Sequence, residues 1–182
     1  NWLFDESMLS NQTKNDNQTV IDKVISIAMN ELDIKEDTNN NLDDKTANAG
    51  ANNYTKYARD FDEKWPNWYN GKKNGFAWCD MFVDHCFLTA FGYEQALKLL
   101  CQPEQSAGAA VNILIIIITI EQVGRIPKIG AQIFFGTTES TINHTCLVYD
   151  IDDTYVYTIE GNSSNQVKKC KYHRGASNLW YD

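Results

Sequence analysis

The segment NGFAWCDMFVDHCFLTAFG, residues 74–92, decides the fold of this 182-residue chain. Within it apolar side chains recur every three or four residues, which is typical of a helix with a buried face. The polar turn NGKKNG at 70–75 precedes the helix, and Gly92 is suited to end it. Cys79 is therefore predicted to open a helix that packs into the core.

Three further helices are predicted around this segment, at residues 20–34, 54–65 and 93–100. The first has Thr19 as a suitable N-cap, and its apolar side chains form one stripe at helical spacing. Between the first two helices, residues 36–53 are predicted to form a long polar loop.

The second half of the chain is rich in β-branched and aromatic residues, in runs separated by polar turns. These runs predict strands at residues 131–135, 144–151, 154–160 and 166–172. Helices followed by strands predict an α+β fold in which N-terminal helices pack on one side of a C-terminal antiparallel sheet.

The length suits one domain with a substantial core. Residues 1–18 are polar and Asn-rich and are predicted to form an arm or linker, which leaves residues 19–182 as the domain. The formal charge of −8 argues against a surface that binds nucleic acid by neutralising phosphates. The first ten residues do not resemble a signal peptide. The longest apolar run, at 111–120, is much shorter than the roughly 20 residues of a membrane helix, so no membrane span is expected.

Among the five cysteines, Cys79 has the surroundings of a nucleophile. At a helix N-terminus, unpaired backbone N–H groups and the helix dipole favour a thiolate. The N–H of Cys79 is also suited to stabilise the oxyanion of a tetrahedral intermediate. The cysteines form no CxxC pairs, so a structural zinc site is not expected.

A thiolate nucleophile needs a base, usually a histidine, and the chain contains three. His85 lies further along the same helix and is expected to point away from the thiol. His173 lies in a polar segment typical of the surface. His144, at the start of a strand after a polar loop, is the favoured base.

The imidazole in turn needs an acceptor that fixes its orientation. The strand after that of His144 ends in Ile-Glu-Gly-Asn, and the two strands are expected to pair across a tight turn. This pairing brings Glu160 or Asn162 beside His144.

These residues lie in segments that resemble a known family. NGFAWCDMFVDHCF, PKIGAQIFF, NHTCLVYD and VYTIEGNSSNQV resemble, in this order, the successive blocks of CHAP domains. CHAP domains are cysteine, histidine-dependent amidohydrolases/peptidases of phage endolysins and bacterial autolysins, and the resemblance covers roughly residues 20–180. It implies a papain-like, NlpC-related fold with Cys79 as nucleophile, His144 as general base, Glu160 as the orienting third residue and Asn162 as a fourth, polarising member.

The resemblance also implies a substrate and a location. The substrate would be bacterial peptidoglycan, cut at amide bonds by an N-acetylmuramoyl-L-alanine amidase or an endopeptidase in the cell wall, outside the cell or delivered by a phage. Tyr54 and Trp78 are expected to line the substrate cleft. Neither a metal nor a cofactor is expected, and the possible protein partners are wall-binding domains or virion proteins.

Two departures from the family pattern, together with the polar N-terminal arm, motivate a non-enzymatic alternative. Cys146 replaces the glycine usual two residues after the base, and an Ile-rich run occupies 113–118. A catalytically degenerate CHAP module could instead be a structural or binding part of a phage tail or cell-surface assembly. A second alternative keeps the thiol chemistry but changes the substrate to a protein or a glutathionyl conjugate.

Overall fold

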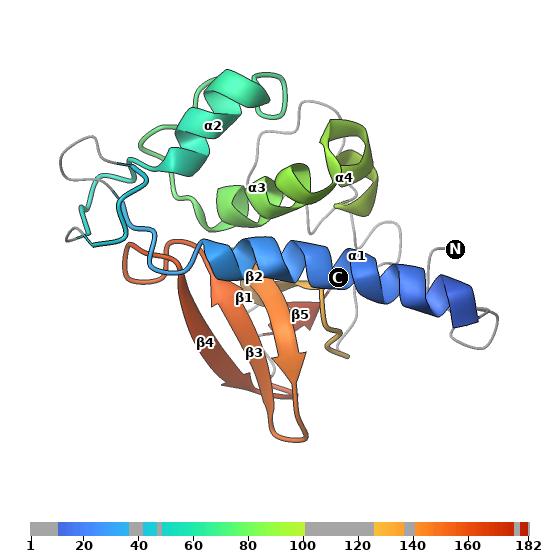
Figure 1. The fold of residues 1–182 in the computed structure, drawn as a ribbon. Coiled ribbons are helices and arrows are strands. Elements are labelled where there is room, and N and C mark those ends of the chain that lie inside the picture. The colour runs from blue at the N-terminus through green and yellow to red at the C-terminus, as the bar shows by residue number, and fades with distance from the viewer. Residues whose placement is uncertain are drawn as a thin grey trace.

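The computed structural model describes residues 11–36, 42–46, 49–100, 126–136, 141–176 and 179–181. These ranges contain four helices followed by five strands (Figure 1): α1 (Asn11–Asn30), α2 (Lys56–Lys64), α3 (Cys79–Phe91), α4 (Tyr93–Leu99), β1 (Gln132–Gly136), β2 (Ile142–Ile151), β3 (Tyr155–Glu160), β4 (Lys168–His173) and β5 (Leu179–Tyr181). The predicted α+β class is confirmed. None of the helices in these ranges combines the length and the apolar character that crossing a bilayer requires.

Helix α1 begins at Asn11, so the prediction that Thr19 is its N-cap was wrong, and residues 11–18 of the predicted arm are helical. This stretch contains neither proline nor glycine, and extending an existing helix costs little once its nucleus has formed. The later part of α1 supplies that nucleus because Val24 and Ala28 are buried in the core. The rest of the predicted arm, residues 1–10, lies outside the described residues.

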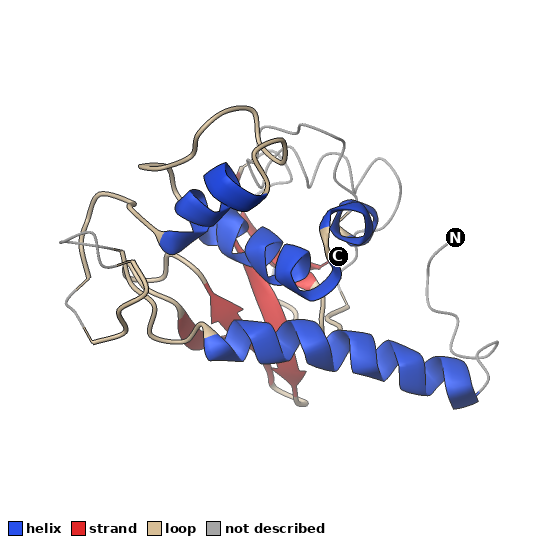
Figure 2. Cartoon of the chain, turned by 45° about the horizontal axis from the view of Figure 1, so that its top comes forward, coloured by secondary structure: helices blue, strands red, loops and turns tan. Residues whose placement is uncertain are grey.

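The five strands form one antiparallel sheet in the order β4-β3-β2-β1-β5. The predicted pairing of β2 with β3 is present, with Leu147 opposite Ile159. In the tight turn between them, the carboxylate of Asp152 accepts hydrogen bonds of 2.7 Å from the N–H groups of Thr154 and Tyr155. The helices gather on one side of the sheet, as the turned view shows clearly (Figure 2).

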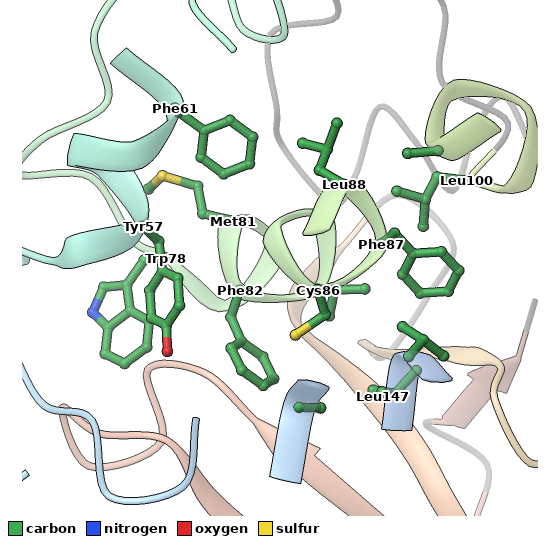
Figure 3. Close-up of a cluster of buried hydrophobic side chains, with 14 of the residues drawn as sticks. Tyr57, Phe61, Trp78, Met81, Phe82, Cys86, Phe87, Leu88, Leu100 and Leu147 are labelled. Carbon is green, nitrogen blue, oxygen red and sulfur yellow. The ribbon is translucent and has the colours of Figure 1, made fainter. Parts of the chain in front are cut away.

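Helix α3 lies at the centre of the core and contacts the other three helices as well as β2 and β3. Its side chains are buried on nearly every side, including the predicted apolar face (Figure 3). Trp78, at its N-terminal end, stacks on Tyr57 of α2 with ring centroids 5.4 Å apart. Burying such a side chain contributes roughly 1.5–3 kcal/mol. The core thus anchors the N-terminus of α3, where Cys79 lies.

Gly161 allows the end of β3 to approach α3 closely. A Cβ added at this position would overlap the Cβ of Phe82 and lie 3.1 Å from Cε3 of Trp78. We therefore expect Gly161→Ala to lower the free energy of unfolding by about 1–3 kcal/mol, as overpacking does in other cores. Urea denaturation would measure this change, and a loss below about 0.5 kcal/mol, the range of ordinary surface substitutions, would contradict the close packing.

Candidate active site

Cys79 is the first residue of α3 and is partly exposed. The N-cap residue Trp78 makes no side-chain hydrogen bond to the helix, so the backbone N–H groups of the first turn are not capped by it. Gly75, with a φ of +88°, turns the chain shortly before the helix. A thiolate at this position is stabilised by the helix dipole, and the same N–H groups are suited to bind an oxyanion.

The imidazole of His144 lies between Cys79 and Glu160. Its Nε2 is 3.0 Å from Oε2 of Glu160. On its other side, the ring is close enough to Cys79 for this thiol to shift the pKa of the imidazole. Because the carboxylate engages Nε2, Nδ1 is the nitrogen left for the sulfur. Burial disfavours the charged ring, but hydrogen bonds to Cys79 and Glu160 outweigh burial and raise the pKa of His144 to about 9. The ring is therefore an imidazolium at neutral pH.

Glu160 ends β3 and is 1% exposed. Besides His144, its carboxylate accepts hydrogen bonds at Oε1 from the hydroxyls of Thr158, at 2.7 Å, and Tyr172, at 2.8 Å. Burial alone would raise the pKa of Glu160, but the hydrogen bonds from His144, Thr158 and Tyr172 lower it to about 2. The carboxylate is thus ionised and fixed in place, which suits it to orient the imidazole.

The sequence patterns did not identify Thr158, Tyr172 and Phe135 as supports of this group. Phe135 stands opposite His144 in the pairing of β1 with β2, with ring centroids 5.5 Å apart, and its other neighbour is Tyr172 at 4.7 Å. Strand alternation would have placed Thr158 on the face of Glu160. The position of Tyr172 depends on the register between β3 and β4, which no local sequence pattern specifies.

The other cysteines in the described ranges are poor competitors as nucleophiles. Burial raises the pKa of the thiols of Cys86, Cys146 and Cys170, most strongly for the first two, which are fully buried. Cys146 follows His144 by two residues in β2, so by strand alternation the two side chains lie on the same face of the sheet. Its thiol interacts with Thr158 and Glu160 from within the core, so it does not occupy the exposed side of the site. Cys101 and the Ile-rich run lie outside the described residues.

Three of the predicted site residues make no described contact with Cys79, His144 or Glu160. Trp78 is fully buried and donates its indole N–H to Glu36 at 3.0 Å, so it belongs to the core and the prediction that it lines a cleft is corrected. The side chain of Asn162 donates to Asn53 at 3.5 Å and makes no described contact with His144, so its role as a fourth member stays a prediction. Tyr54 is 48% exposed, next to Asn53, whose carbonyl accepts a hydrogen bond from the N–H of Gly75.

The other two histidines are placed as the sequence predicted. His85 lies in the core, where its Nε2 is 3.0 Å from Oδ2 of Asp60. His173 is exposed on β4. In the described parts of the chain, no three or more His, Cys, Asp or Glu side chains are grouped so that they could hold a metal ion.

Comparisons with family models, with curated proteins and with solved structures gave no match for this chain. The functional interpretation therefore rests on the site geometry and on the sequence motifs.

The charged pair His144–Glu160 gives the folded state a defined pH dependence. The pKa of His144 rises from 6.5 to about 9, so its contribution to stability is complete below pH 6.5 and is lost as the pH rises through about 9. The pKa of Glu160 falls from 4.5 to about 2, so its contribution is complete above pH 4.5 and is lost as the pH falls through about 2. We expect the free energy of unfolding to be highest between these ranges and to decline on both sides.

Glu160→Gln removes the charge and should abolish the acidic limb of this profile. It should weaken the alkaline limb only in part, because Cys79 also raises the pKa of His144. The midpoint of urea denaturation, measured from pH 3 to pH 10 in both proteins, tests the expectation. Parallel profiles for the wild type and the variant would show that the pair does not form.

Proposed function

We propose that this chain is a cysteine amidohydrolase of papain-like, CHAP-type fold that cleaves amide bonds in bacterial peptidoglycan. The observation that carries the chemistry is the position of His144 between the partly exposed Cys79 at a helix N-terminus and the buried carboxylate of Glu160. The choice of peptidoglycan as substrate is supported by the resemblance of the WC..FV and IEGN segments to CHAP domains.

In the proposed acylation step, the thiolate of Cys79 attacks the amide carbonyl carbon. The electron pair of the C=O bond moves to oxygen, where the N–H groups at the start of α3 stabilise the oxyanion. As the tetrahedral intermediate collapses, the C–N bond breaks and the imidazolium of His144 gives its proton to the leaving amine. The products of this step are a thioester on Cys79, a free amine and a neutral imidazole.

In the proposed deacylation step, water attacks the thioester while the neutral His144 accepts a proton from it. The C–S bond then breaks, which releases a carboxylic acid and restores the thiolate–imidazolium pair. Glu160 stays ionised throughout because its pKa of about 2 lies far below neutral pH. Its role is to hold the ring and to stabilise the charged form of His144.

The enzymatic interpretation is favoured over a degenerate module by the position of Cys146. A degenerate site would be expected if this residue crowded the histidine. Instead the Cys146 side chain is 0% exposed and belongs to a buried apolar cluster with Ile133, Phe135, Val148 and Val156.

Digestion of purified peptidoglycan tests the proposal. We expect new amino groups and the matching muropeptide fragments in mass spectra, whose masses also distinguish an amidase from an endopeptidase. Walls of several cross-link types should be used, with Cys79→Ala as the blank. A panel of peptides and glutathionyl conjugates run in parallel would detect the other substrate classes. Spectra identical to the blank for all walls would reject peptidoglycan as the substrate.

A further inference from the structure

A series of buried hydrogen bonds connects Asp80, which follows Cys79, to Thr145, which follows His144. The Gln132 amide nitrogen donates to Oδ1 of Asp80 at 3.1 Å and to the hydroxyl of Thr145 at 2.9 Å. The hydroxyl of Thr145 in turn donates a hydrogen bond to the carbonyl oxygen of Ile133 at 2.8 Å. Asp80 and Gln132 are 4% and 2% exposed, so these hydrogen bonds are shielded from solvent.

Two oxygens of these side chains have no hydrogen-bond partner among the described residues, namely Oδ2 of Asp80 and Oε1 of Gln132. If Asp80 were ionised, both would be buried acceptors without a donor, which is costly. A proton on Oδ2 supplies the missing donor. The two side chains can then form a ring of two hydrogen bonds. In one, the N–H of Gln132 donates to Oδ1 of Asp80, and in the other, the O–H of Asp80 donates to Oε1 of Gln132.

The charges around Asp80 also favour the neutral acid. Asp84, one turn later in α3, is a buried carboxylate that accepts hydrogen bonds from Trp68 at 2.8 Å and Tyr69 at 2.5 Å. Cys79 precedes Asp80 directly. Burial, then the charges of Asp84 and Cys79, raise the pKa of Asp80, and the hydrogen bond from Gln132 opposes them only in part.

We propose that Asp80 is protonated at neutral pH and forms a cyclic acid–amide pair with Gln132, and that this pair is a clasp that positions Cys79 against His144. The clasp joins the first turn of α3 to β1 and, through Thr145, to β2. It therefore limits how far the sulfur and the imidazole can separate. Being neutral, it places no second anion beside the thiolate. The positioning role rests on the proposed thiol chemistry, whereas the protonation of Asp80 does not.

Infrared spectroscopy tests the protonation without any substrate. We expect the wild type at pH 7 to show the C=O stretching band of a protonated carboxylic acid, and Asp80→Asn to lose that band. Asparagine has the same shape and restores both hydrogen bonds with its own amide, so the fold should persist in this variant. A wild-type spectrum without such a band, or a band that survives in Asp80→Asn, would overturn the inference.

Alkylation of Cys79 by iodoacetamide at pH 6 tests the positioning. We expect Asp80→Asn to react at close to the wild-type rate, whereas Asp80→Ala and Gln132→Ala should react about tenfold more slowly, since small displacements of reacting groups cost that much or more. Circular dichroism confirms that the variants are folded, and if neither alanine variant folds, Gln132→Met serves in their place. Equal rates in all variants would overturn the clasp. Slow alkylation of the wild type with the infrared band intact would instead reject the thiol site and the clasp's role there, leaving the protonation of Asp80 standing.

Discussion

Cys79→Ala is expected to reduce the release of peptidoglycan fragments by about 10⁴-fold or more, to the level of the enzyme-free control. Alanine cannot attack the carbonyl, and a water molecule in its place would lack the covalent thioester route. The fold should be retained because Cys79 is partly exposed at the start of α3 and the core residues around it are unchanged. Rates of fragment release measured by mass spectrometry at equal concentrations of folded protein give the ratio.

Cys86→Ala is the matched control for this experiment. Cys86 lies in the same helix, but its thiol is fully buried and its pKa is raised by burial, so it should not react. We expect the control to be less stable by about 1 kcal/mol, a common cost of a buried truncation, and to cleave at near the wild-type rate. Equal losses in the two variants would show that a structural defect, and not the missing nucleophile, explains the result.

His144→Ala is expected to lower the rate of cleavage by about 10³- to 10⁴-fold. When catalytic residues act as one unit, removing one of them lowers the rate nearly as much as removing all of them. The variant loses both the counter-ion of the thiolate and the proton donor for the leaving amine. A double variant with Cys79→Ala should be no slower than Cys79→Ala alone. The same mass-spectrometric assay measures all three proteins.

His173→Ala controls for the loss of an imidazole. His173 is exposed on β4, where its ring packs at a tilt against Tyr155 with centroids 4.8 Å apart, and it makes no described contact with the site. We expect this variant to retain wild-type activity. If His144→Ala retained activity to within about threefold, well short of the 10²–10⁴ that a general acid–base supplies, His144 would not be the base.

The main architecture could be predicted because it depends on local patterns. The helical spacing of apolar residues identified α3, and the runs of β-branched and aromatic residues identified β1 to β4 to within two residues at their ends. The tight turn after β2 predicted the pairing that brings Glu160 beside His144. These inferences need only the neighbours of each residue in the chain.

The remaining features depend on contacts between distant segments. The indole of Trp78 points into the core toward Glu36, 42 positions earlier in the chain, and nothing beside Cys79 in the sequence indicates that direction. The Asp80–Gln132 contact joins residues 52 positions apart. Asn162 has a φ of +56° in the loop after β3, and its side chain reaches Asn53 and not the imidazole, which the residue order alone does not specify.

The rate at which iodoacetamide alkylates Cys79, measured from pH 4 to pH 10 with the site of modification assigned by mass spectrometry, shows directly whether His144 acts on this sulfur. We expect Cys79 to be alkylated faster than Cys86, Cys146 and Cys170, and His144→Ala to slow this reaction below about pH 9, where the wild-type ring is charged. A rate at Cys79 that is the same in the wild type and in His144→Ala at every pH would contradict the proposed pairing of these two residues.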